Sequence, residues 1–200
     1  MFSKLEPEEY FMDFYIDVKL ISNKEKSINY VLNEVYGRLH KELSALGSEV
    51  IGVSFPAYKV LLGNIIRIHG SADDLTKLQR NNWVGNYIAY CDVGAILPVP
   101  TDCKFRTVSR IQPSMSKSKL TRVIKRGSIP DNEIKEYRAK MFSKGLKEPY
   151  LELVSVSNGH KHRRYISFSE LYNTHHDGRF DSFGLSKTAT IPWFDQKKDA

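Results

Sequence analysis

The chain has 200 residues, of which 41% are hydrophobic, which suffices for a folded core and excludes a disordered chain. Its net charge is +7 and is unevenly spread, with −3 on residues 1–103 and +10 on residues 104–200. No apolar run is long enough for a membrane span, no signal peptide pattern opens the chain, and Cys91 and Cys103 lack zinc spacing. We therefore expect a cytoplasmic protein with reduced thiols whose second half makes the electrostatic contacts.

The first half begins with a predicted strand and a long predicted helix. Residues 13–20 alternate, with Tyr15 among the polar positions, and predict a half-buried strand. Ser27 is the expected cap of a helix that ends at Gly47, with His40 beside its apolar stripe. That stripe consists of Ile28, Val31, Leu32, Val35, Leu39, Leu43 and Leu46.

The following segments complete a recognisable order of elements. Strands are expected at 50–55 and 65–70, a helix at 72–80 capped by Ser71, and a fourth strand within 86–99. The order β-α-β-β-α-β is the ferredoxin-like arrangement, which RNA-recognition domains share. We therefore predict an α+β protein whose N-terminal ferredoxin-like (RRM-like) domain spans residues 12–100, followed by a second α+β domain over residues 104–194.

The second half begins with a strand predicted at 105–112 and a strongly basic stretch. Residues 104–126 contain eight basic side chains and no acidic one. The predicted helix 116–126, from Ser116 to the stop at Gly127, puts its basic side chains on one face and Leu120, Val123 and Ile124 on another. Such a ridge of like charge suits a polyphosphate, so the helix predicts a nucleic-acid groove contact, with a solvated lysine-rich helix as the alternative.

A further helix is expected from about Pro130 to Lys144, and then a β-hairpin over residues 150–168. Asn158-Gly159 favours a two-residue turn between two β-rich runs. The turn predicts the cross-strand pairs Ser157–His160, Ser155–His162 and Leu153–Arg164. One hairpin face would then carry Ser155, Ser157, His160, His162 and Arg164.

Few residues carry a recognisable chemistry on pattern alone. The chain has no phosphate-binding glycine loop and no zinc-protease motif. One hypothesis is a metal site built from four histidines, namely His160, His162, His175 and His176. These histidines lack carboxylate or cysteine partners at regular spacing. The other reading is metal-free RNA cleavage, in which a histidine transfers protons while the RNA 2′-hydroxyl attacks. His40 is a candidate, and a surface histidine packed beside Tyr36 is the structural alternative.

Six short motifs in order resemble one known family. They are GRLHKEL at 37–43, IGVSFP at 51–56, RIHGSADDL at 67–75, VSRIQ at 108–112, SVSNG at 155–159, and FGLSK at 183–187 with PWF at 192–194. The chain resembles the type I-F CRISPR RNA-processing endoribonucleases, the Csy-type members of the repeat-associated nuclease superfamily. The resemblance implies metal-independent cleavage of pre-crRNA at the base of a repeat stem-loop, a cyclic phosphate product, retention of the crRNA hairpin and no cofactor.

The resemblance also implies roles for individual residues. His40 would transfer protons and Ser155 would contact the 2′-hydroxyl. Phe183 and His162 would support the catalytic site, the latter at a position where the family stacks an aromatic ring on a base. Arg110 and Gln112 would read bases near the foot of the stem, and Arg122, Lys125 and Arg126 would contact phosphates. The basic stretch and the predicted hairpin face add further members to the predicted RNA-binding set: Arg106, Lys119, Ser157, His162 and Arg164. The partners would be the CRISPR repeat RNA and other subunits of a type I-F surveillance complex.

One departure from the family pattern keeps two alternatives open. Phe183 occupies the position of a usual tyrosine, so no phenol there can orient His40. A hairpin-binding structural subunit that does not cleave is therefore an alternative. A general RNA-recognition module is a separate alternative, which would usually carry exposed aromatic side chains on its central strands, whereas the strand at 13–20 offers only Tyr15 opposite the core side. Within the site, a Ser155–His162 pair is a rival to His40 because the predicted register places the two residues opposite each other.

Overall fold

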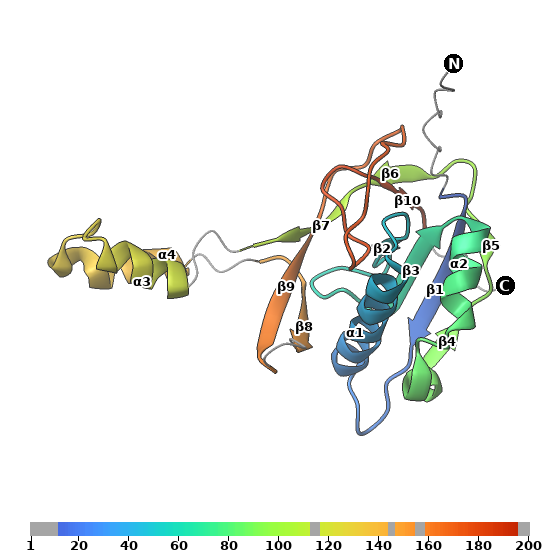
Figure 1. Cartoon of the computed structure of the whole chain (residues 1–200), viewed down its shortest axis with the longest axis horizontal. Helices are drawn as coiled ribbons and strands as arrows, with labels where there is room; N and C mark the ends of the chain where they lie inside the picture. The colour runs from blue at the N-terminus through green and yellow to red at the C-terminus, as the bar shows by residue number, and fades with distance from the viewer. Residues whose placement is uncertain (1–11, 113–116, 144–146, 155–158, 196–200) are drawn as a thin grey trace, which may run out of the picture.

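The computed structural model describes residues 12–112, 117–143, 147–154 and 159–195. These residues form a mixed α+β structure with three antiparallel sheets and, at one end, a pair of helices that stands away from the sheets (Figure 1). No helix among them is both long and apolar enough to cross a membrane.

The largest sheet is built by the first half of the chain. Its strand order is β2-β3-β1-β4, with β5 also pairing with β1, and all of these pairs are antiparallel. The strands are β1 (Phe14–Leu20), β2 (Gly52–Ser54), β3 (Ile65–Gly70), β4 (Cys91–Val93) and β5 (Leu97–Pro98). The predicted fourth strand is only partly confirmed, because residues 85–90 form a 3-10 helix, η1 (Gly85–Tyr90), before β4.

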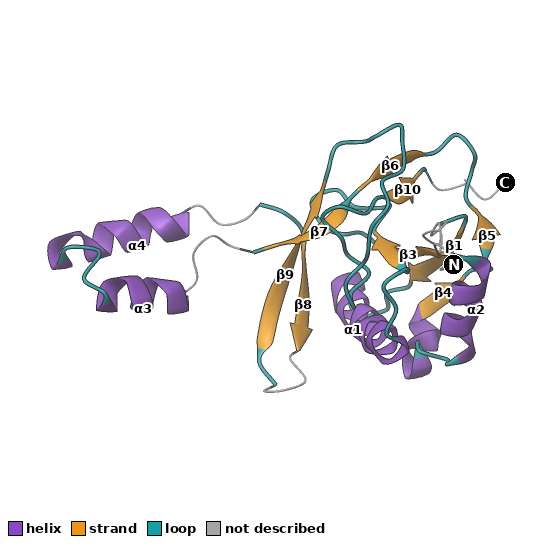
Figure 2. Cartoon of the chain, turned by 45° about the horizontal axis from the view of Figure 1, so that its top comes forward, coloured by secondary structure: helices purple, strands orange, loops and turns teal. Residues whose placement is uncertain are grey.

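Two helices lie on one face of this sheet (Figures 1 and 2). They are α1 (Ile28–Leu46) and α2 (Ala72–Arg80), and the predicted order β-α-β-β-α-β is confirmed. Ser27 accepts a hydrogen bond from the backbone N–H of Tyr30, and Gly47 ends α1 in the left-handed conformation with φ 59°. Most of the predicted stripe is buried, but Leu46 is exposed and Tyr36, which was not in the stripe, is buried.

The opposite face of the sheet is covered as well, which the alternation in β1 did not predict. Tyr15 is buried beneath the ring of Phe194, at 4.9 Å between ring centroids. Arg67 on β3 forms a bidentate ion pair with Asp17 and donates to the carbonyl of Phe194. The C-terminal segment is thereby fixed to the sheet.

The single strand predicted at 105–112 is wrong, because two short strands in different sheets replace it. β6 (Lys104–Arg106) pairs with β10 (Ile191–Trp193), whereas β7 (Val108–Ile111) pairs with β9 (Lys161–Phe168). Between them Thr107 exchanges hydrogen bonds with Ser169, so the chain changes sheets at this residue. β8 (Tyr150–Val154) completes the sheet β7-β9-β8.

The second half of the basic stretch and the helices that follow it form a helical arm that projects from this sheet. The arm holds α3 (Lys117–Lys125), η2 (Asp131–Glu133) and α4 (Ile134–Ser143), and the two α-helices lie side by side in both views (Figures 1 and 2). Gly127 ends α3 with φ 67°, as predicted, whereas the predicted cap Ser116 and the predicted end of the next helix at about Lys144 lie outside the described residues. Leu120 and Ile129 are buried but do not belong to the main core, so the arm has a small apolar interior of its own.

One apolar core joins the two predicted domains. The buried cluster contains Ile16 and Leu39 from residues 12–100 and Leu151, Ile166 and Ile191 from residues 104–194. The core therefore holds α1 against the hairpin of β8 and β9, and the candidate site lies where these elements meet.

Candidate active site

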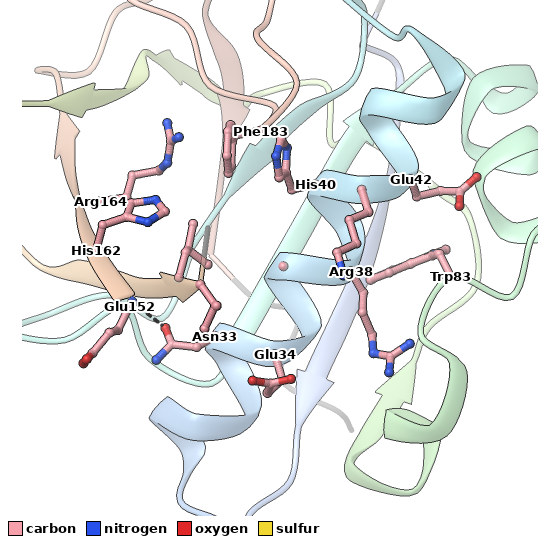
Figure 3. A pocket seen from close by; sticks show the side chains of 14 residues that line it. Asn33, Glu34, Arg38, His40, Glu42, Trp83, Glu152, His162, Arg164 and Phe183 are labelled. Atoms are coloured by element: carbon pink, nitrogen blue, oxygen red, sulfur yellow. Dashed lines mark hydrogen bonds between the residues drawn. The ribbon is translucent and has the colours of Figure 1, made fainter. Parts of the chain in front are cut away.

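A cavity of about 640 Å³ opens between α1, the β8–β9 hairpin and the segment around Phe183. Four residues of the predicted site line it together: His40, His162, Arg164 and Phe183 (Figure 3). Asn33 on α1 accepts a hydrogen bond from the backbone N–H of Glu152 at 2.9 Å, which joins the helix to β8. Side chains far apart in the sequence are thus held around one opening.

The hairpin that supplies His162 and Arg164 has a different register from the predicted one. Leu153 pairs with His162 and Leu151 with Arg164, so the predicted Leu153–Arg164 pair is wrong by two residues. Because side chains alternate with a period of two, this shift leaves His162 and Arg164 on the same face of the strand. The predicted Ser155–His162 pair is wrong by the same two residues, because Leu153 is the partner of His162, and the register therefore does not support a Ser155–His162 pair as a rival to His40. The third predicted pair, Ser157–His160, involves a residue outside the described part of the chain.

His40 is held by a backbone carbonyl. Its Nδ1 lies 2.8 Å from the carbonyl oxygen of Ser182. A carbonyl oxygen can only accept a hydrogen bond, so Nδ1 carries the hydrogen and the neutral ring has its lone pair on Nε2. Nε2 is therefore the nitrogen that can take a proton from a ligand in the cavity and return it.

The turn that presents the Ser182 carbonyl is fixed on both sides. Asp181 accepts hydrogen bonds from the backbone N–H groups of Phe183 and Leu185, at 2.9 and 3.0 Å. Gly184 has φ 68° and lies against Val53 of β2 so closely that an added Cβ would be 2.3 Å from a methyl carbon. Only glycine fits there, which explains why the turn lies at this position against the sheet.

The ring of Phe183 lies between His40 and Arg164. It stacks on the His40 ring at 3.4 Å between centroids and 10° between planes, and the guanidinium carbon of Arg164 lies 3.4 Å from its centroid. Phe183 has no hydroxyl group, but the hydroxyl of buried Tyr36 donates to the Phe183 carbonyl at 2.7 Å. Burial raises the pKa of Tyr36, so its phenol stays a neutral donor. A tyrosine on α1 thus fixes the segment that holds His40.

Arg164 carries a charge that is largely removed from solvent. Burial lowers the pKa of Arg164, and the positive charge of Arg110 acts in the same direction. Arg110 and Gln112, the two residues expected to read bases, line a second cavity of about 760 Å³ together with Lys187. The cationic groups of both cavities therefore lie near the segment 181–187.

The remaining predicted RNA-binding residues are placed differently. Arg106 is buried, donates to the Ser169 carbonyl and the Tyr58 hydroxyl, and lies 4.5 Å from the Trp193 ring, so it supports the fold rather than an RNA surface. Arg122, Lys125 and Arg126 of the arm are exposed. The side chain of Lys119, like Ser155 and Ser157, lies outside the described part of the chain.

The other histidines have partners that explain them structurally. His69 is fully buried and within hydrogen-bonding distance of the Ser54 hydroxyl, and burial lowers its pKa well below the usual 6.5. His175 lies 3.2 Å from Asp177, and His176 packs on Tyr172. Among the described residues no group of three histidine, cysteine or carboxylate side chains is arranged to hold a metal ion.

Two contributors to the site were not identified from the sequence as functional. Tyr36 precedes His40 by one helical turn, a spacing that places both side chains on one face. Ser182 lies in a short turn between Asp181 and Gly184, which is a turn signal without any sign of what it contacts. Both act through contacts between residues more than 140 positions apart in the sequence.

Comparison with known proteins agrees with the motifs. Residues 15–194 match the family described as CRISPR-associated protein (Cas_Csy4). The chain is 33% identical over 184 residues to the CRISPR-associated endonuclease Cas6/Csy4 of Escherichia coli (strain UTI89 / UPEC), covering 92% of this chain and 100% of that protein. It is also 33% identical over 187 residues to the CRISPR-associated endonuclease Cas6/Csy4 of Pseudomonas aeruginosa (strain UCBPP-PA14), with the same coverage. The resemblance is confirmed, and the chain belongs to the Cas6/Csy4 family of CRISPR-associated endonucleases.

Proposed function

We propose that the chain is a type I-F endoribonuclease that binds the CRISPR repeat stem-loop and cuts pre-crRNA at the base of the stem without a metal ion. The observation that carries this proposal is the state of His40, whose Nδ1–H is held by the Ser182 carbonyl while Nε2 is left for the cavity. A histidine fixed in one tautomer beside a cavity of about 640 Å³ suits general acid–base chemistry.

The chemistry needs little from the protein because RNA carries its own nucleophile. Nε2 of His40 would take the proton of the 2′-hydroxyl, whose oxygen attacks the adjacent phosphorus. The bond from phosphorus to the 5′-oxygen then breaks, which leaves a cyclic phosphate on the upstream product and a 5′-hydroxyl on the downstream one. Ser155, which follows β8, would contact the 2′-hydroxyl, and His162 would stack on a base beside the scissile bond.

The two halves of the chain would divide the work. Residues 12–100, with the strand order β2-β3-β1-β4 and two helices on one face, would form a ferredoxin-like domain that carries His40. Residues 104–194 would bind the hairpin, with Arg122, Lys125 and Arg126 of α3 on phosphates and Arg110 and Gln112 on bases at the foot of the stem. A charge of +10 on residues 104–200 supports tight retention of the product hairpin.

A second function is favoured by one observation, the phenylalanine at position 183. Without a phenol there, the chain could serve as a structural subunit that holds the crRNA hairpin without cutting it. The Tyr36 hydroxyl and the Ser182 carbonyl would take over the positioning of His40 and Phe183 that a phenol at position 183 would otherwise provide. This favours the nuclease. In either case we expect the protein to act in the cytoplasm with other subunits of a surveillance complex.

Incubation of the protein with its repeat hairpin in EDTA tests the proposal. We expect one cut at the base of the stem and a product that ends in a cyclic phosphate. Tight binding without cleavage would support the structural subunit instead. Weak binding that does not distinguish the repeat from other stems would contradict both.

A further inference from the structure

We propose that Arg164 contacts the scissile phosphate and stabilises the negative charge that grows on it during cleavage. This inference rests on the proposed function, and it gives Arg164 a defined ligand in the RNA, the non-bridging oxygens of one phosphate. Three observations support it: Arg164 is buried, no carboxylate of the described residues pairs with it, and it lines the same cavity as His40.

Arg164 is a buried cation that forms no ion pair with a carboxylate in the described part of the chain. Its relative exposure is 6%, and within the described ranges no carboxylate lies within ion-pairing distance of its guanidinium. The carboxylate of Asp181 acts on it only at longer range and already accepts two backbone hydrogen bonds. The Nε of Arg164 is buried without a hydrogen-bond partner.

An unpaired buried charge is costly unless a ligand compensates it. The second positive charge of Arg110 adds to that cost. The contact with the Phe183 ring supplies no hydrogen-bond acceptor for the N–H groups of the guanidinium. A polyanionic substrate supplies the acceptors, and the planar guanidinium matches the geometry of a phosphate.

The position of Arg164 relative to His40 fits one phosphate group. Both side chains line the same cavity and lie on opposite faces of the Phe183 ring (Figure 3). Since each lies 3.4 Å from the Phe183 centroid, the centre of the His40 ring and the guanidinium carbon are at most about 7 Å apart. A phosphodiester placed at the edge of the Phe183 ring could therefore meet His40 through the 2′-oxygen and Arg164 through a non-bridging oxygen.

The two residues would have separate tasks in the reaction. As the 2′-oxygen bonds to phosphorus, the 2′-hydroxyl proton passes to Nε2 of His40, and as the bond from phosphorus to the 5′-oxygen breaks, the protonated His40 returns a proton to the departing 5′-oxygen. Arg164 exchanges no proton, because a guanidinium stays charged throughout. It would donate hydrogen bonds to the non-bridging oxygens, where the charge of the transition state collects.

The sequence offers a matched control next to Arg164. Arg163 is exposed and points to the other side of β9, where its guanidinium lies 4.5 Å from the Tyr150 ring. Replacing Arg163 by methionine removes the same charge from the same strand without touching the cavity. Arg164→Met keeps an apolar stem over Phe183, and thermal unfolding of both variants shows whether each is folded.

The rate of cleavage gives the first readout. In single-turnover cleavage with saturating hairpin, we expect Arg164→Met to be about 10²- to 10³-fold slower than the parent, the usual loss for a group that stabilises an oxyanion. Arg163→Met should cleave within about threefold of the parent, because an exposed charge far from the phosphate contributes little. A cleavage rate of Arg164→Met equal to that of Arg163→Met would overturn the proposal.

The closing experiment measures binding, so that it does not depend on cleavage. The probes are two product-length stem-loops that are identical except that one ends in a 3′-phosphate and the other in a 3′-hydroxyl. We expect the parent and Arg163→Met to bind the phosphate-ended hairpin roughly tenfold or more tightly, as for a charged hydrogen bond, and Arg164→Met to lose this preference. The same preference in Arg164→Met, or none in the parent, would overturn the proposal even if the protein binds RNA without cutting it.

Discussion

Tyr36→Phe tests how the catalytic histidine is positioned. The change removes only the hydroxyl that donates to the Phe183 carbonyl at 2.7 Å, and the aromatic contacts of Tyr36 with Phe55 and Phe183 can remain. The carbonyl would then lack its donor inside the protein, which should lower the free energy of unfolding by about 1–3 kcal/mol. If about 1–2 kcal/mol of this lost stabilisation serves to position His40, the barrier to cleavage rises by that amount, and single-turnover cleavage should fall roughly 5- to 30-fold.

The assay compares cleavage and binding in the same variant. Affinity for a hairpin with a 2′-deoxy group at the cleavage site should stay within about twofold, because Tyr36 is buried and does not line the cavity. Tyr30→Phe is the control, since Tyr30 lies on the same helix, is exposed and contacts the Tyr87 hydroxyl instead. A Tyr36→Phe protein that is folded, less stable and as fast as the parent would refute the positioning argument.

Three other perturbations test separate parts of the account. Replacing Arg122, Lys125 and Arg126 together by alanine should lower the slope of log affinity against log salt by roughly 0.7–0.9 per lost phosphate contact, and an unchanged slope would show that α3 does not meet phosphate. His162→Phe should cleave within about tenfold of the parent and faster than His162→Ala, because base stacking needs a flat ring; a phenylalanine variant with no activity would place His162 among the proton-transfer groups. Because His69 has a pKa well below 6.5 in the folded state, only the unfolded state binds its proton near pH 6, so stability should fall as the pH drops below 6.5, by about 1.4 kcal/mol at pH 5.5. Chemical denaturation of the parent and His69→Gln at pH 7.5 and 5.5 measures this loss, which the variant should lack.

Local signals in the sequence predicted the elements of the fold well. Ser27 and Ser71 cap α1 and α2, and Gly47 and Gly127 end their helices in the left-handed conformation. Capping and glycine turns depend on a few neighbouring residues, so a sequence pattern can show them.

The structure differs from the predictions where contacts between segments far apart in the sequence determine strand register and burial. The hairpin register is two residues from the predicted one, because a shift of two keeps every side chain on its face and the apolar pattern cannot distinguish the two alternatives. Docking of β8 on α1 through Asn33 and pairing of β9 with β7 set the register instead. Tyr15 is buried for a similar reason, since Phe194 from the end of the chain covers it.

The candidate site also contains residues that the sequence predicted and residues that it did not. His40, His162, Arg164 and Phe183 were identified from motifs and pairing, and the structure brings them to one cavity. The Ser182 carbonyl and the Tyr36 hydroxyl were not identified from the sequence. A backbone carbonyl has no sequence signature, and a buried tyrosine on a helix is usually an ordinary core residue. Arg106 shows the reverse error, since its place in a basic stretch predicted an RNA contact but its guanidinium packs inside the fold.

Single-turnover cleavage of the repeat hairpin by His40→Ala in EDTA tests the central claim most directly. The account predicts a rate about 10²- to 10⁴-fold below the parent, because a proton-transfer group is lost. Binding of the 2′-deoxy hairpin should stay within about twofold, and His175→Ala, which changes an exposed histidine beside Asp177, should cleave like the parent. Cleavage by His40→Ala at the parent rate would contradict the assignment of His40 as the residue that moves the proton.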